Sequence, residues 1–174
     1  MESIIDIPEH VVALQREATS AERRAAAFVA ALPDLLEARG FPEEAALCRS
    51  VCARHERAIE WLRQSALAWE RLPEAEPRSR EFVLRVASPR HLVEVALELE
   101  REAFCCHEVA WDGMDEPVLR AQFERLLVMA RDNVGTLVQV RSRLPEAVDW
   151  EQLIAAGTVP SLALGAERRL RRSH

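Results

Sequence analysis

The sequence predicts an all-α protein: a four-helix bundle of two antiparallel helical hairpins, a long crossover between them and a short C-terminal fifth helix. Of its 174 residues, 49% are apolar and only five are glycine, which suits one helical domain with a substantial core. Four long segments carry apolar residues alternately three and four apart, the spacing of a buried helix face. Residues 21–62 and 99–137 also resemble each other, as one hairpin repeated. We therefore assign residues 1–157 to the bundle and 158–174 to a basic, flexible tail.

The first hairpin is predicted from helices over residues 8–37 and 42–72. Asp6 is a suitable N-cap, and Pro8 suits a first turn because its missing N–H would be unpaired there. Gly40 and Pro42 then interrupt the helical pattern. The apolar stripe of the second helix contains one buried imidazole candidate, His55.

The second hairpin is predicted from helices over residues 89–112 and 116–144. Ser88 followed by Pro89 is typical of a helix start, and Asp112-Gly113 of a helix end. Residues 73–88 form the longer link between the hairpins, and residues 150–156 form the short fifth helix. A simple up-and-down bundle would not need so long a link between its second and third helices. The loop lengths therefore favour two hairpins joined by a crossover.

Charge and hydropathy exclude several classes of function. The net charge of −6, without a lysine-rich stripe, argues against a general nucleic-acid surface. No apolar run reaches membrane-spanning length, and the first ten residues contain acids before any apolar stretch, unlike a secretory signal. We expect a cytoplasmic protein that binds neither nucleic acid nor membranes.

The four cysteines lie within predicted helices and are expected to be reduced, largely buried thiols. They are Cys48, Cys52, Cys105 and Cys106. Parallel second and third helices would place Cys48 and Cys106 on the order of 20 Å apart at the 1.5 Å rise of a helix, so they cannot share an ion. A site made from Cys52, His55 and one further ligand stays open as an alternative.

The segment Leu97-Glu-Leu-Glu-Arg-Glu-Ala103, with Phe123-Glu-Arg-Leu within residues 117–127, resembles the rubrerythrin and ferritin-like superfamily over most of residues 10–143. The resemblance implies a glutamate on the first helix of each hairpin and a Glu-x-x-His pair on the second. The glutamates correspond to Glu22 and Glu100. The tyrosine-like positions seven residues later correspond to Val29 and His107.

The Glu-x-x-His pairs that the resemblance implies are missing. Their positions hold His55 and Ala58 in the first hairpin and Ala130 and Asn133 in the second, and no Glu-x-x-His occurs anywhere in the chain. Two iron or manganese ions need about four carboxylates with outer imidazoles, so di-iron chemistry is not expected. We expect a polar network in which Asn133 could hydrogen-bond across the bundle; the alternative is a single iron, manganese or zinc ion held by Glu22, His55 and Glu100.

The C-terminal segment Ser161-Leu-Ala-Leu-Gly-Ala-Glu-Arg-Arg169 resembles the loading peptides of encapsulin cargo proteins. It departs from their pattern at Glu167, where leucine is usual. The resemblance implies docking of a few apolar side chains into a shell pocket after a flexible linker. A basic, solubilising end is the alternative interpretation.

The sequence offers no other catalytic constellation. No glycine-rich phosphate loop is present, and the few serines lack a matching histidine and acid. We therefore predict a non-catalytic interaction or scaffold protein that forms a homodimer or binds another protein. The alternatives are a metal-binding protein with the reduced ligand set and encapsulin cargo.

Overall fold

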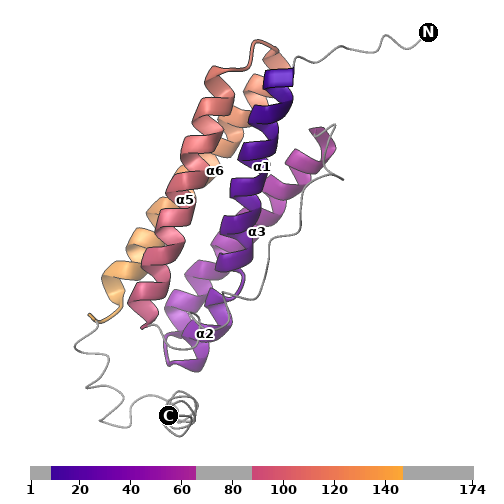
Figure 1. Ribbon diagram of the computed structural model, residues 1–174. Coiled ribbons are helices and arrows are strands. Elements are labelled where there is room, and N and C mark those ends of the chain that lie inside the picture. The colour runs from indigo at the N-terminus through magenta and orange to yellow at the C-terminus, as the bar shows by residue number, and fades with distance from the viewer. Residues whose placement is uncertain (1–8, 66–87, 147–174) are drawn as a thin grey trace, which may run out of the picture.

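The computed structural model describes residues 9–65 and 88–146, which form helices, the short links between them and three residues after α6 (Figure 1). The four long helices pack together and the short α2 lies at one end. Their bounds are α1 Glu9–Val29, α2 Leu32–Ala38, α3 Pro42–Ser65, α5 Pro89–Asp112 and α6 Pro117–Arg143. The predicted all-α class and the four packed helices are confirmed.

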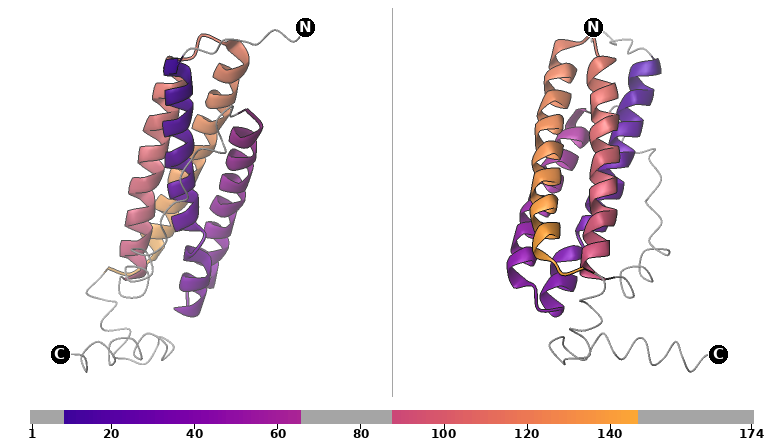
Figure 2. Two further views of the ribbon diagram at one scale, coloured as in Figure 1. Left: turned by 45° about the vertical axis from the view of Figure 1, so that its right-hand side comes forward. Right: turned by 90° about the vertical axis from the view of Figure 1, so that its left-hand side faces the viewer.

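The long helices form two antiparallel pairs. Figures 1 and 2 show α1 and α6 running in one direction and α3 and α5 in the other. α5 packs on α1 and α6, while α3 packs on α1 and α6 from the opposite side. The helices α3 and α5 are therefore parallel to each other and lie diagonally across the bundle.

The first predicted helix is wrong as a single element, because it breaks between α1 and α2. Pro33 lies in the first turn of α2, and proline has no N–H to donate to the carbonyl four residues earlier. That carbonyl belongs to Val29, and the thiol of Cys52 on α3 approaches it at 3.7 Å. The break therefore leaves an acceptor that the neighbouring helix satisfies.

The starts of α5 and α6 agree with the sequence. The Ser88 hydroxyl accepts a hydrogen bond from the His91 N–H at 3.2 Å, and the Glu116 carboxylate accepts one from the Leu119 N–H at 2.7 Å. Each cap satisfies a donor that the helix cannot pair itself. Gly40 has φ of 86°, a conformation that favours glycine, so it turns the chain from α2 into α3.

Two apolar clusters occupy the two ends of the bundle. Near α2, the core includes Leu32, Leu36, Val51, Leu92 and Val140. At the other end, it includes Leu62, Ala110, Met114, Phe123 and Leu126. Between them, Ala21 and Ala25 on α1 meet Ala103 on α5. These small side chains let α1 and α5 approach each other at the level where the buried polar residues lie.

No helix within the described ranges is both long and apolar enough to cross a bilayer. The Asp6 cap, the crossover, the fifth helix over 150–156 and the tail over 158–174 lie outside the described residues.

Candidate functional site

A layer of polar side chains lies in the middle of the bundle. It consists of Glu22 on α1, His55 on α3, Glu100 and His107 on α5, and Asn133 on α6. None of these five residues is more than 3% exposed. Because burying such groups without partners is costly, their contacts decide what the layer can do.

His55 lies between the two glutamates. Its Nδ1–H donates to Glu22 Oε1 at 2.6 Å, and its Nε2–H donates to Glu100 Oε1 at 2.5 Å. A ring that donates from both nitrogens is an imidazolium. His55 therefore joins α3 to α1 and α5 through two charge-assisted hydrogen bonds.

The second oxygen of each glutamate has its own partner. His107 Nε2–H donates to Glu22 Oε2 at 2.9 Å, and Asn133 Nδ2 donates to Glu100 Oε2 at 3.2 Å. Arg54 Nε in turn donates to Asn133 Oδ1 at 2.5 Å. A continuous chain of hydrogen bonds thus crosses all four long helices.

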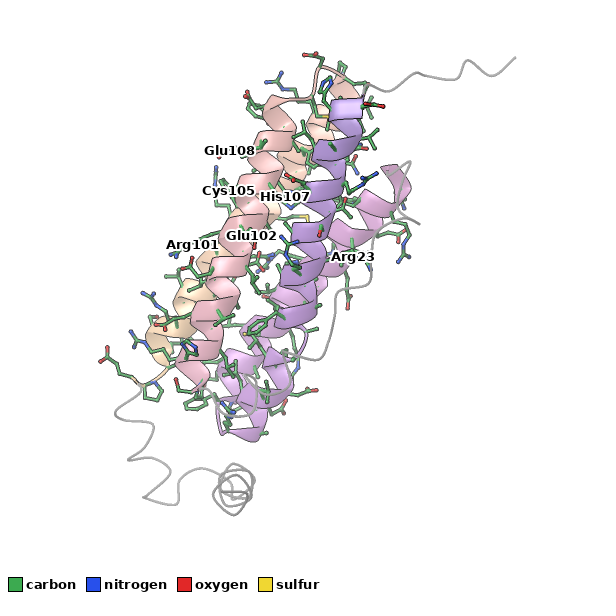
Figure 3. The ribbon with its side chains drawn as sticks, viewed as in Figure 1. Arg23, Arg101, Glu102, Cys105, His107 and Glu108 are labelled. Carbon is green, nitrogen blue, oxygen red and sulfur yellow. The ribbon has the colours of Figure 1, made fainter. Side chains whose placement is uncertain are left out.

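Opposite charges face each other within this layer. The Glu22 carboxylate meets the His55 imidazolium, and the Arg54 guanidinium reaches Glu100 through Asn133. Figure 3 shows His107 on the side of α5 near α1, whereas Cys105 and Glu108 lie on its outer side. His107 Nδ1 is the one buried side-chain nitrogen or oxygen without a hydrogen-bond partner in the described part of the chain.

The electrostatics follow from burial and these hydrogen bonds. Burial raises the pKa of Glu22, but the hydrogen bonds from His107 and His55 outweigh it and lower the pKa to about 2. Burial lowers the pKa of His55, but its bonds to Glu100 and Glu22 raise the pKa to about 9. Both shifts favour the ion pair at neutral pH.

The sequence placed Glu22, His55 and Glu100 near one another, and the structure brings these three together. The oxygen and nitrogen atoms of these side chains that could bind a metal do not converge on one point, because the two ring nitrogens of His55 face different carboxylates. A single ion could take at most one of those nitrogens. Across residues 9–65 and 88–146, no group of three or more His, Cys, Asp or Glu side chains is arranged to hold a metal ion. The donor types suit iron, manganese or zinc, but this arrangement does not fit a dinuclear centre.

None of the hydrogen bonds described for this layer involves a cysteine. All four cysteines are free, as predicted, but only Cys48 is buried; Cys52 and Cys106 are half-buried and Cys105 is exposed. The expectation of largely buried thiols is therefore wrong for Cys105, whose position lies on the outer side of α5. Burial raises the pKa of Cys48 to about 12, which keeps that thiol protonated and unreactive at neutral pH.

Sequence reasoning placed His107 at a tyrosine-like position but did not predict that it or Arg54 belongs to the layer. His107 follows Glu100 by seven residues, two helical turns on the same face, so its spacing carried a usable signal. Arg54 gave no such signal in the sequence, because Asn133, the residue that it reaches from α3, lies 79 positions further along the chain. Asn133 does hydrogen-bond across the bundle, as the sequence interpretation proposed.

Comparison with known proteins adds no relative. No protein-family model, curated protein or solved structure matches this chain.

Proposed function

We propose that this chain is a non-catalytic helical interaction protein whose bundle is held together by an internal ionic layer. One observation carries the proposal: the buried carboxylates and imidazoles are hydrogen-bonded to one another, in the order Glu100, His55, Glu22 and His107. Groups engaged in this way serve packing and helix pairing, as buried polar groups do in other helical bundles.

The helix directions support a ferritin-like arrangement as part of this proposal. In such folds the long crossover makes the second and third bundle helices parallel, as α3 and α5 are here (Figure 1). On this view the layer occupies the region where ferritin-like proteins with complete ligand sets would hold two metal ions. We also propose that the protein acts in the cytoplasm and associates as a dimer.

A metal-binding protein is the second candidate, and His107 is the observation that favours it. With Glu22, His55 and Glu100, it completes a set of two carboxylates and two imidazoles. Binding one iron, manganese or zinc ion would require His55 to lose a proton and turn away from one glutamate. The ion would then compete with the hydrogen bonds that hold the layer together.

Elemental analysis of the full chain purified without chelator separates the two candidates. We expect far less than one equivalent of iron, manganese, zinc or copper per chain. Adding each metal separately should leave the thermal midpoint unchanged, since a bound ion would raise it.

The matched variants are His55→Ala and His91→Ala, the second of which removes an exposed histidine from α5. Stoichiometric metal that His55→Ala abolishes and His91→Ala retains would overturn the proposal in favour of the metal-binding candidate. The cargo hypothesis rests on residues 161–169 and stays a prediction.

A further inference from the structure

The two halves of α3 are held to the bundle in different ways. The first half buries three apolar side chains in the cluster near α2, those of Ala45, Cys48 and Val51. The second half, residues 54–64, buries two apolar side chains, Ala58 and Leu62, together with the imidazole of His55. The buried part of the second half therefore combines little apolar surface with one charged group.

A groove lies on each side of the second half. One groove, of about 490 Å³, lies between α1 and α3 and is lined by residues that include His55 and Ile59. The other, of about 560 Å³, lies between α3 and α6 and is lined by residues that include Trp61, Gln64 and Val118. The last turns of α3 also diverge from α1 (Figures 1 and 2). Residues 54–64 thus have a groove on each flank within the described part of the chain.

Polar contacts join this segment to all three of the other long helices. His55 donates to the two glutamates of the layer, on α1 and α5, at 2.6 and 2.5 Å. Arg54 donates to two side chains of α6 at 2.5 and 2.8 Å. Gln122, also on α6, donates to the Trp61 carbonyl at 2.7 Å. Because hydrogen bonds weaken steeply with distance and angle, a small displacement of the segment would break these contacts together.

We propose that residues 54–64 form a flap that opens separately from the rest of the bundle, with His55 and Arg54 as its latch. Segments with few buried apolar contacts are those that open locally in a folded protein. Opening breaks the polar contacts, while the first half of α3 stays packed near α2. Solutes then reach the two glutamates and His107, which are at most 3% exposed when the flap is closed. The inference rests on the proposed function in one respect: no metal ion locks the layer.

Hydrogen–deuterium exchange of the full chain, followed by mass spectrometry at pH 7, tests the proposal. After correction for intrinsic rates, residues 55–62 should exchange about tenfold faster or more than residues 96–107 in the centre of α5. All amides of residues 55–62 should share one rate. This distinguishes the opening of a flap from fraying, in which exchange slows progressively away from the helix end.

Two variants release the latch. His55→Gln keeps one donor and loses a charge-assisted hydrogen bond, so it should speed the exchange of residues 55–62 about tenfold or more. Arg54→Met removes the contacts with α6, whose acceptors there are uncharged. It should act in the same direction and serves if His55→Gln does not fold.

Val51→Ala is the control, because Val51 belongs to the half of α3 that stays packed when the flap opens. It should lower global stability and so speed exchange in residues 96–107, but leave residues 55–62 unchanged. Circular dichroism confirms that each variant is folded.

Equal exchange of residues 55–62 and 96–107, a graded rate from the helix end, or equal acceleration of residues 55–62 by His55→Gln and Val51→Ala would overturn the flap. Metal content measured on the same preparations keeps the two proposals distinct. Stoichiometric metal overturns the proposed function whatever the exchange pattern, whereas a metal-free chain with uniform exchange overturns the flap alone.

Discussion

The two hairpins, which the sequence predicts as copies of one unit, contribute unequally to the polar layer. The first carries its imidazole on the second of its long helices, as His55, and has Val29 at the position that corresponds to His107. The second carries its imidazole on its first helix, as His107, and places Asn133 on the other. A dinuclear centre needs matching ligands from both hairpins. The layer instead satisfies each carboxylate oxygen once, so hydrogen bonding to the two glutamates explains its composition.

The hairpins also differ in how they close. α5 and α6 are joined by one short turn, and both helices begin with a side-chain cap. The first hairpin instead contains the break at Pro33, and a groove lined by residues that include Ala27 and Ile59 runs between α1 and α3. His55 lines that groove while also bonding Glu22 and Glu100. The first hairpin therefore combines a residue that joins both glutamates of the layer with a groove at its surface.

The largest effect is expected from His55→Ala. Removing the imidazolium leaves Glu22 and Glu100 buried near each other with one fewer donor each, which should cost about 3–5 kcal/mol of unfolding free energy. Urea unfolding followed by circular dichroism at pH 6 measures it. His55→Gln keeps one donor and should retain part of the stability if alanine prevents folding.

His91→Ala is the control for this measurement, because His91 is exposed on α5. It should change the free energy of unfolding by less than about 0.5 kcal/mol, as surface substitutions usually do. Equal effects of the two substitutions would contradict a special role for the first hairpin's imidazole.

The pH dependence of stability should have two limbs. The pKa of His55 rises from 6.5 to about 9 on folding, so its contribution is complete below pH 6.5 and is lost as the pH rises through 9. The pKa of Glu22 falls from 4.5 to about 2, so its contribution is complete above pH 4.5 and is lost as the pH falls through 2. Each limb should amount to about 3 kcal/mol, since one pKa unit corresponds to about 1.4 kcal/mol.

The two limbs describe one ion pair from both sides, so they are not independent contributions. Unfolding free energies between pH 2 and 10 should show a plateau from about pH 5 to 6.5, the interval between the unfolded pKa values. His55→Ala should flatten the alkaline limb. If stability is still lost at alkaline pH in this variant, the titration of another group causes the loss.

Helix positions were predictable from the sequence because apolar spacing, Ser88-Pro89 and Gly113 are local signals. The break at Pro33 was predictable in principle, since the proline is visible, but the continuing apolar stripe favoured one long helix. The compensating contact from Cys52 to Val29 depends on tertiary packing. Such a contact leaves no mark in the local pattern.

The candidate site was partly predictable for a similar reason. Glu22, His55 and Glu100 stand at positions that a helical register can align, whereas their exact pairing depends on side-chain conformations in the packed bundle. Which nitrogen of His55 meets which carboxylate, and the approach of Arg54 to Asn133, follow only from the fold.

The smallest effect is expected from Asn133→Ala, in the second hairpin. It removes a neutral donor from Glu100 and an acceptor from Arg54, which should cost about 1–3 kcal/mol. Thr136→Ala removes a part-buried bond from Arg54 and the exposed bond from the Thr136 hydroxyl to the Asp132 carbonyl, and it serves as the control. Because the bonds from His55 and Asn133 both end on Glu100, the double variant of these two residues should depart from additivity by about 0.5–3 kcal/mol. Strict additivity would mean that the two hairpins stabilise the layer separately, and the comparison between them would then lose its physical link.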